Sequence, residues 1–401
     1  MIDVKEATNT LLANLPFLSA ETCPLGDAHG RTLRQAVVAD RDLPPFDRIM
    51  MDGIAFHSSA GGDIATKGMR FPVLCLQAAG SPAQTLAVKA GCIEVATGAI
   101  LPVGADTILP VEDIESHGDH VLVPPGTSFA PGKYIHKQAS DHPAGTTLLH
   151  PGTLLSPKEI AVAASCGCAQ LEVSSLPSIA LVSTGDELVP IHETPLPHQI
   201  RQSNAHTLAA AILSRNLGQP HLHHIPDDPS ELESHIRHLL GMHDILVFSG
   251  GVSMGKKDFL PQVLEKLGVE KVFHWVAQRP GKPLWFGKTQ DGKPVFGLPG
   301  NPLSTLTCFH RYLLPALEAM SARTPAHILQ IPLAEPFEFP PPLTCFLPVA
   351  LTHSSGATQA IPAPAHNSGD YSGILLTHGF LEIPARTNEA QPGDAFPFFP
   401  W

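Results

Sequence analysis

Basic side chains are scarce in this 401-residue sequence, which has 25 Lys and Arg against 37 Asp and Glu and a formal net charge of −12. Nucleic-acid-binding proteins normally carry a basic stripe, and its absence argues against DNA or RNA as a partner. No apolar run reaches the ~18 residues of a membrane span. The opening residues, MIDVKEATNTLL, also lack the basic and apolar regions of a signal peptide. We therefore expect a cytoplasmic protein that does not enter a membrane.

Recognisable cysteine motifs are also lacking. The seven cysteines are scattered, and Cys166 and Cys168 have C-x-C spacing instead of the C-x-x-C of redox and zinc sites. Reduced thiols are the expectation for a cytosolic protein. The segment HLHHI contains His221, His223 and His224 without an acid or cysteine at ligand spacing, so we expect a packing or surface role for them.

Proline, in contrast, is abundant, with 41 residues spread along the chain. This is about twice the usual proportion of ~5%. The spread favours many short elements joined by rigid turns over a disordered tail. The length suggests roughly two to four domains.

The first half of the chain changes its pattern twice. Helical spacing of apolar residues predicts a helix over 3–15, and a capping pattern predicts another over 156–167. Short β-like runs separated by Gly and Pro predict an inserted β domain over 46–144. If the flanking helices pack together, residues 1–45 and 145–176 form one discontinuous N-terminal domain.

Strand and helix patterns alternate from 177 to 325, which predicts a parallel, doubly wound α/β domain. A long final helix over 303–320 is expected to be bent or interrupted at Pro315. Residues 326–401 are short, proline-rich runs that predict a small C-terminal β-barrel or sandwich. The predicted strands and helices of the α/β domain are 178–183, 203–218, 221–225, 228–241, 244–249, 258–268, 271–277 and 303–320.

Four loops are expected to meet at the carboxyl edge of this sheet, where open α/β sheets bind ligands. Their sequences are STGDE, SGGVSMGKKD, RPGKP and GLPGNP. Glycine pairs and a turn before a helix can offer backbone N–H groups to an anion. The candidate binding residues are Ser183, Thr184, Gly185, Ser249, Gly250, Gly251, Ser253, Arg279, Pro299, Gly300, Asn301 and Pro302.

Charged residues of both signs occur in the same loops. Arg279 and Lys282 form a basic pair that would neutralise phosphate. Asp186, Glu187 and Asp258 suggest Mg²⁺, which takes one or two carboxylates together with phosphate oxygens and water. Each loop alone could be a turn or a helix cap, so the argument rests on all four meeting at one edge.

The ordered motifs resemble the molybdopterin molybdenumtransferase family, in a gephyrin E-domain-like arrangement. The resemblance covers almost the whole chain. It is carried by PPFDRIMMDGIA, ATGAILPVGADTILPVED, STGDEL, DDP, SGGVSMGKKDF, RPGKPLWFGK and GLPGNPLS, in that order.

The resemblance implies a discontinuous helical domain, an inserted β domain, a molybdopterin-binding α/β domain and a C-terminal β-barrel. It implies an elongated homodimer, with the active site between the α/β domain of one subunit and the N-terminal domains of the other. The implied reaction inserts molybdenum from molybdate into the dithiolene of adenylylated molybdopterin, with Mg²⁺-dependent release of AMP. Other molybdenum cofactor biosynthesis proteins and molybdoenzyme chaperones are implied as possible partners.

The same resemblance assigns roles to particular residues. Thr97 joins the binding residues, and the acid of the DDP motif is Asp227 or Asp228. The implied catalytic residues are Asp47, Asp186, Glu187, Asp258 and Lys282. The implied metal ligands are Asp186, Glu187, Asp228 and Asp258. Asp52 and Gly53, in contrast, are interpreted as the turn that starts the inserted β domain.

Two departures from the family pattern leave an alternative open. Arg48 and Ile49 replace the usual Asn-Ser pair, and the segment IHKQASD (135–141) replaces an Arg-rich segment ending in GED. Because Arg and Lys differ at bidentate anion sites, the alternative is a catalytically impaired paralogue that binds molybdopterin as carrier, scaffold or regulator. An interaction protein using residues 326–401 is a third hypothesis, and the sequence does not distinguish molybdenum from tungsten.

Overall fold

The computed structural model describes residues 1–62, 64–253, 258–354, 356–363, 370 and 372–401. The chain forms two compact units. The first contains Met1–Gln35, Pro151–Ile160 and Ala169–Trp401, and the second contains Ala36–His150 and Ala161–Cys168. The four-region division expected from the sequence stays a prediction. Among the described residues, no helix is both long and apolar enough to cross a membrane.

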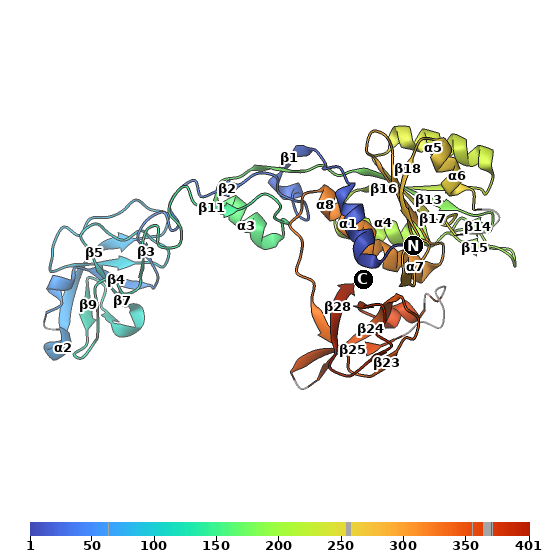
Figure 1. Ribbon diagram of the computed structural model, residues 1–401. Helices are drawn as coiled ribbons and strands as arrows, with labels where there is room; N and C mark the ends of the chain where they lie inside the picture. The colour runs from blue at the N-terminus through green and yellow to red at the C-terminus, as the bar shows by residue number, and fades with distance from the viewer. Residues whose placement is uncertain (63, 254–257, 355, 364–369, 371) are drawn as a thin grey trace. The chain divides into compact units, whose positions relative to one another are not determined.

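A six-stranded sheet is the centre of the α/β part of the first unit (Figure 1). Neighbouring strands are parallel except at β20, which is antiparallel to both of its neighbours. The prediction of a parallel sheet is therefore wrong for this strand. Its connections, 275–284 and 289–293, are shorter than the dozen or so residues of a parallel crossover. In sheet order the strands are β16 (Gln219–Ile225), β13 (Ser178–Thr184), β17 (Ile245–Ser249), β21 (Pro294–Leu298), β20 (Trp285–Lys288) and β18 (Glu270–His274).

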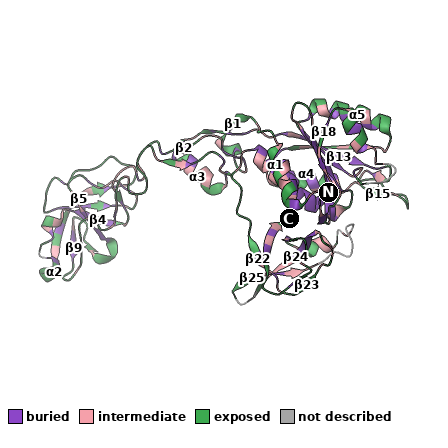
Figure 2. Cartoon of the chain, in the orientation of Figure 1, coloured by how far each residue is buried: buried purple, intermediate pink, exposed green. Residues whose placement is uncertain are grey.

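Helices cover both faces of this sheet because successive apolar side chains of a strand point to opposite sides. Ile179 and Leu181 of β13 pack in a core with α1, α4, α7 and α8, whereas Ala180 and Val182 pack with α5 and α6. Figure 2 shows β13 buried and α5 with both buried and exposed residues. The doubly wound arrangement is thus present. The helices are α1 (Val4–Ala13), α4 (Asn204–Ser214), α5 (Pro229–Met242), α6 (Leu260–Lys266), α7 (Pro302–Cys308) and α8 (Leu314–Met320).

One helix ends earlier than the sequence predicts, and the final helix is interrupted close to the expected proline. α4 stops at Ser214, and Asn216 with φ 50° takes the left-handed position that was expected at Gly218. The long final helix is interrupted by a π-helical turn, Phe309–Leu313, which ends two positions before Pro315. A proline has no N–H to donate along the helix, so a change of hydrogen bonding at this point is physically reasonable.

The N-terminal part of the first unit is built from segments distant in sequence. β1 (Ala20–Pro24) pairs antiparallel with β12 (Gln170–Ser174). Helix α3 (Pro157–Ser165) begins in the first unit, where the capping pattern predicted, and its residues from Ala161 on are assigned to the second unit. The Ser156 N–H donates to Glu159 Oε2 at 3.1 Å, and the Ser156 hydroxyl donates to the same carboxylate. This pair fixes the first turn of the helix.

The second unit contains the β structure predicted between residues 46 and 144. Its six-stranded sheet is antiparallel except between β5 and β6. Two apolar clusters, around Ile93 and around Phe71, pack on it. In sheet order the strands are β7 (Thr107–Pro110), β4 (Gly53–Phe56), β6 (Cys92–Val95), β5 (Met69–Gln77), β9 (His120–Val123) and β8 (Glu115–Ser116). Further elements are α2 (Ile64–Lys67) and the pairs β2 (Val37–Val38) with β11 (Thr147–Leu149) and β3 (Arg48–Ile49) with β10 (Ile135–His136).

The C-terminal β part has its own apolar core, which includes Leu347 and Leu381. Its sheet takes one strand, β19 (Gln278–Arg279), from the segment between β18 and β20. Because β19 pairs with β24, the RPGKP segment is attached to both parts of the unit. The remaining strands of the first unit are β14 (Leu188–Val189), β15 (Ile200–Arg201), β22 (Gln330–Pro332), β23 (Phe337–Glu338), β24 (Thr344–Ser354), β25 (Ala357–Pro362), β26 (Gly379–Ile383), β27 (Glu389–Ala390) and β28 (Ala395–Pro400).

Candidate functional site

A cavity of about 660 Å³ opens at the carboxyl ends of β13, β17 and β21. All four predicted loops contribute to its lining, the RPGKP loop through Pro283 alone, as expected for an open α/β sheet. Residues 254–257 of the second loop lie outside the described residues. The predicted residues in the lining are Ser183, Thr184, Gly185, Glu187, Ser249, Gly250, Gly251, Ser253, Asp258, Pro299, Gly300, Asn301 and Pro302. We call this the first cavity.

The two glycines after β17 have backbone angles that favour glycine, with φ 105° at Gly250 and 69° at Gly251. A Cβ on either residue would lie 3.0 Å from an oxygen of Thr184. The two loops therefore touch through backbone and a small side chain. The Gly250 N–H donates to the Leu298 carbonyl at 3.1 Å, so it holds the adjacent loop. The Thr184 hydroxyl is buried and has no partner within the described part of the chain.

The GLPGNP loop is held in place by polar side chains. Asn204 Nδ2, at the start of α4, donates to the Gly300 carbonyl at 2.8 Å. The Thr305 hydroxyl, in the first turns of α7, donates to the carbonyls of Pro299 at 2.5 Å and Asn301 at 3.0 Å. The turn therefore keeps its shape through bonds to two helices.

Sequence reasoning missed several residues of this lining. Arg201 of β15 is the most informative, because a guanidinium can pair with phosphate. Its Nε donates to the Glu193 carbonyl at 3.1 Å. The sequence shows only that Arg201 is a basic residue just before a predicted helix. Because Arg201 does not follow a strand of the six-stranded sheet, the sheet-edge rule did not select it. The other missed residues are Leu188, Ile200, Gln202, Ser203, Asn204, Pro283 and Ser304.

The DDP motif divides its two acids between different tasks. Asp227 lines the first cavity, and its N–H donates to Asp186 Oδ1 at 3.1 Å. Asp228, predicted as a metal ligand, is instead the N-cap of α5 and is absent from the lining. The hydroxyl of Ser230 and the N–H groups of Glu231 and Ser230 lower the pKa of Asp228. The structure thus brings Asp227, and not Asp228, to the cavity.

The carboxylates of this region are oxygen donors of the kind that Mg²⁺ prefers. Glu187, Asp227 and Asp258 line the cavity, with Asp186 beside them. Within the described ranges, no group of three His, Cys, Asp or Glu side chains is arranged to hold a metal ion. Mg²⁺ needs only one or two carboxylates when phosphate oxygens and water complete its shell, so the donor set fits Mg²⁺ bound with a phosphate ligand.

The histidines of β16 pack, as expected. The rings of His221 and His223 lie 5.0 and 5.4 Å from the ring of His243. His224 has a further contact that the sequence did not reveal, because its Nε2 lies 3.1 Å from the Gly185 carbonyl. The pairing of His224 with Ser183 across the parallel strands explains this contact with the STGDE loop.

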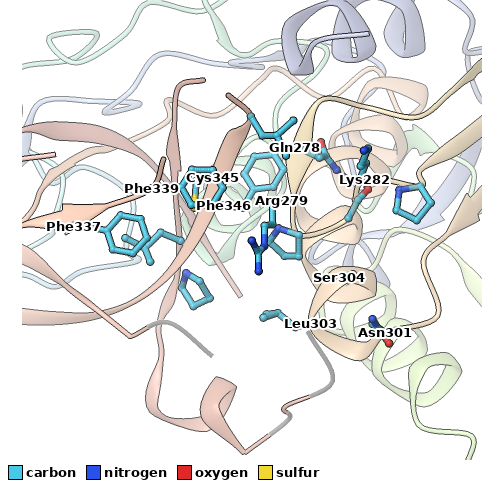
Figure 3. Close-up of a pocket in the computed structure, with 16 residues that line it drawn as sticks. Gln278, Arg279, Lys282, Asn301, Leu303, Ser304, Phe337, Phe339, Cys345 and Phe346 are labelled. Atoms are coloured by element: carbon cyan, nitrogen blue, oxygen red, sulfur yellow. Dashed lines mark hydrogen bonds between the residues drawn. The ribbon is translucent and has the colours of Figure 1, made fainter. Parts of the chain in front are cut away.

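A second cavity, of about 650 Å³, shares Pro283, Asn301 and Ser304 with the first. Arg279 and Lys282, expected at the same site as the other loops, line this second cavity instead. Figure 3 shows both basic residues with Gln278 on one side and the rings of Phe337 and Phe339 on the other. The apolar wall comes from the C-terminal β part and comprises Phe337, Phe339, Leu343, Cys345, Phe346, Leu347 and Pro348.

Asp47 belongs to the second unit, where it is already paired. It accepts from Lys137 Nζ at 2.8 Å and from the Gln138 N–H at 2.9 Å. Partial burial acts to raise the pKa of Asp47, but the bonds from Lys137 and Gln138 outweigh it and hold the pKa below its ordinary value. Lys137 and Gln138 both lie in the segment 135–141, where the sequence departs from the family pattern. This segment thus supplies the hydrogen-bond donors to Asp47, the acid that the resemblance implies is catalytic.

The two departures also meet each other in the second unit. Arg48 Nη2 lies 3.1 Å from His136 Nδ1, and His136 Nε2 lies 2.8 Å from Asp141 Oδ1. Asp52, interpreted as a turn residue, accepts from the Thr97 N–H at 2.6 Å. This bond lowers the pKa of Asp52 and ties the turn to a predicted binding residue.

Comparison with known families covers most of the chain. Residues 2–167 match the "MoeA N-terminal region (domain I and II)", 180–319 the "Probable molybdopterin binding domain" and 330–401 the "MoeA C-terminal region (domain IV)". A molybdopterin molybdenumtransferase of Synechocystis is 37% identical over all of both chains. The chain belongs to the molybdopterin molybdenumtransferase family.

Other members agree with this assignment. The molybdopterin molybdenumtransferase of Synechococcus elongatus is 35% identical over 85% of each chain, and that of Staphylococcus epidermidis is 29% identical over 98% of this chain and 94% of its own. A crystal structure of a molybdopterin biosynthesis MoeA protein from Pyrococcus horikoshii is 28% identical, with a TM-score of 0.80 over 100% and 99% of the two chains. The multidomain α/β fold and the enzyme family expected from the sequence are therefore confirmed, and the chain is a homologue of molybdenum cofactor biosynthesis enzymes.

The Asp47–Lys137 pair gives a prediction about pH. Replacing Lys137 by Met should raise the pKa of Asp47, measured by ¹³C carboxyl NMR titration, because the ammonium that stabilises the carboxylate is lost. The folded pKa of Asp47 is depressed, so the pair stabilises the fold above the unfolded pKa of about 3.9. That contribution disappears as the pH falls through the folded pKa.

The melting difference between wild type and Lys137→Met should accordingly be present at pH 7 and shrink in acid. Lys133→Met is the matched control, because Lys133 lies over the Tyr134 ring instead of beside a carboxylate. An Asp47 pKa that is unchanged in Lys137→Met would contradict the interpretation.

Proposed function

We propose that this enzyme inserts molybdate-derived molybdenum into adenylylated molybdopterin and releases AMP in a Mg²⁺-dependent reaction. The observation that carries the proposal is the pair of neighbouring cavities. One is lined by glycine turns, hydroxyls and acids, and the other by Arg279 and Lys282 against an apolar wall. This arrangement suits a substrate whose phosphoanhydride lies in the first cavity and whose dithiolene receives the metal of an oxyanion held in the second.

We assign the first cavity to the adenylate and its phosphates. The buried Thr184 hydroxyl, without a described protein partner, suits hydrogen bonding to a phosphate oxygen. Arg201 adds a positive charge to the lining of the same cavity. One or two of the lining acids Glu187, Asp227 and Asp258 would hold Mg²⁺ together with phosphate oxygens and water, and Asp186 accepts a hydrogen bond from the Asp227 N–H. A bound Mg²⁺ would polarise the phosphoanhydride, whose cleavage yields AMP.

We assign the second cavity to molybdate. Arg279 and Lys282 supply two positive charges for an oxyanion that carries two negative charges. The apolar wall strengthens such charge pairing by excluding water. Burial raises the pKa of Cys345 to about 12, so its side chain stays a neutral thiol near pH 7. A neutral thiol is a poor metal ligand, which leaves the dithiolene of the substrate as the sulfur donor for molybdenum.

The second candidate function is a catalytically impaired paralogue that binds molybdopterin without inserting metal. The pairing of Asp47 with Lys137 and Gln138 is the observation that favours it. In this family pattern Asp47 is an active-site acid, and an occupied carboxylate is less available to metal or water. Tight binding of adenylylated molybdopterin without AMP release would support this candidate.

Turnover should depend on the acids of the first cavity. Purified protein with adenylylated molybdopterin, molybdate and Mg²⁺ should release AMP, and EDTA should stop the release. Asp258→Asn and Asp186→Asn should lower the rate roughly a hundredfold or more, as is usual when a preorganised charge at a reacting group is lost.

Asp228→Asn is the matched control, since Asp228 caps α5 outside the cavity lining. It should retain turnover and melt at a slightly lower temperature, because a helix cap is weakened. Normal AMP release by both Asp258→Asn and Asp186→Asn would count against the assignment of the acids.

The glycine turn should be required for binding AMP in the first cavity. Gly250→Ala places a Cβ 3.0 Å from the Thr184 carbonyl at a φ of 105°. Such strain costs about 1–3 kcal/mol, and AMP affinity measured by calorimetry should fall roughly tenfold. Gly241→Ala on α5, where a Cβ meets nothing within 4 Å, should leave AMP affinity unchanged. Equal AMP affinity of Gly250→Ala and wild type would refute the role of the turn.

We also propose a homodimer, which rests on the family resemblance. Light scattering of the purified protein should give the mass of two 42.6 kDa chains. A mass of one chain across the concentration range of the activity assay would rule out the dimer as the active species.

A further inference from the structure

The RPGKP loop rests on one buried amide. Gln278 is 0% exposed and directly precedes Arg279. Its Nε2 donates to the Gly281 carbonyl at 3.0 Å and lies 3.6 Å from the Cys308 sulfur. Its Oε1 accepts from the Tyr312 hydroxyl. A single side chain thus joins the middle of the loop to the helix behind it.

Gly281 fits this position because it has no side chain. Its φ is 88°, and a Cβ would collide with the Cys308 sulfur and lie 2.9 Å from Gln278 Nε2. The Cys308 thiol also donates to the Gly281 carbonyl at 3.7 Å. Burial raises the pKa of Cys308, which keeps the thiol protonated and able to donate. The Gly281 carbonyl therefore receives two side-chain donors at the back of the loop.

The backbone around Gln278 is also fixed. The Val276 N–H donates to the Lys282 carbonyl at 3.0 Å, which closes the loop. The Thr344 N–H of β24 donates to the Ala277 carbonyl at 3.0 Å, which ties the loop to the C-terminal sheet. Tyr312 lies in the π-helical turn, a feature that often occurs at functional sites.

We propose that Gln278, Tyr312 and Cys308 are positioning residues that hold Arg279 and Lys282 in the geometry needed to bind an oxyanion in the second cavity. The inference rests on the proposed function for the identity of that anion as molybdate. A buried amide is costly unless its hydrogen bonds are made, and an apolar side chain could fill the same volume. What this network adds is a fixed backbone conformation between Arg279 and Lys282, because Gln278 and Cys308 both bind the Gly281 carbonyl.

A purely structural role and a positioning role predict different measurements. Loss of structure would lower the stability of the fold and weaken ligand binding in both cavities. Loss of positioning would weaken oxyanion binding while AMP binding in the first cavity stays the same. The experiment therefore measures molybdate, tungstate and AMP affinities of the full-length protein by calorimetry.

Gln278→Met keeps the side-chain volume and removes both hydrogen-bonding groups. We expect molybdate and tungstate affinities to fall roughly tenfold, the scale of leaving buried polar groups unpaired, with AMP affinity unchanged. Gln77→Met is the matched control. Gln77 is also 0% exposed and donates to the carbonyls of Ala78, Ser81 and Pro82, but it lies in the second unit. It should lose stability and keep its oxyanion affinity.

Tyr312→Phe keeps the proposal testable if Gln278→Met does not fold. As a single variant, Tyr312→Phe should lower the oxyanion affinity and leave the AMP affinity unchanged. In the Gln278→Met background it should lower the oxyanion affinity little further, because Tyr312 acts through Gln278. Unchanged oxyanion affinity in both single variants, with a wild type that binds molybdate, would overturn the positioning role only. A wild type that binds neither oxyanion would overturn the assignment of the second cavity and this inference with it.

Discussion

The direction of the strands is the constraint on which both cavities depend. Five strands of the central sheet run the same way, so the loops after β13, β17 and β21 leave from one edge. β20 runs in the opposite direction, and the segment 275–284 before it therefore stays at that edge. A parallel crossover would have carried the chain to the other end of the sheet. The reversed strand thus keeps the segment with Arg279 and Lys282 at the sheet edge where the first cavity opens, and the cavity that these two residues line shares Pro283, Asn301 and Ser304 with the first.

Much of this fold could be predicted because apolar periodicity reports burial directly. The runs SIALVS and DILVFS became β13 and β17, with alternate side chains in two different cores. Periodicity carries no information about strand direction, so the reversal of β20 was missed. The short connections on either side of β20 held that information. The end of α4 was misplaced because Asn216, like Gly218, can adopt the left-handed conformation.

The residues of the candidate site were predictable where they follow a strand of the central sheet. They were uncertain where two adjacent residues of the same type could both fill the position. Thr184 and Asp258 were expected from the sheet-edge rule, and they line the first cavity. Asp227 and Asp228 are equivalent in the motif, but Pro229 and Ser230 make the second acid a helix cap. Arg201 was missed because it comes from the short β14–β15 ladder, which only tertiary folding brings to the cavity. The Asp47–Lys137 pair joins residues ninety positions apart, which no local pattern reveals.

The wall between the two cavities is made by residues that face both. Pro283, Asn301 and Ser304 belong to each lining, whereas Thr184 belongs only to the first and Lys282 only to the second. Because Ser304 belongs to both linings, any movement of its side chain changes the surface of both cavities at once, and a coupling of this kind acts equally in both directions. Variants at Ser304 will report on both ligands together, while variants at Thr184 and Lys282 separate them.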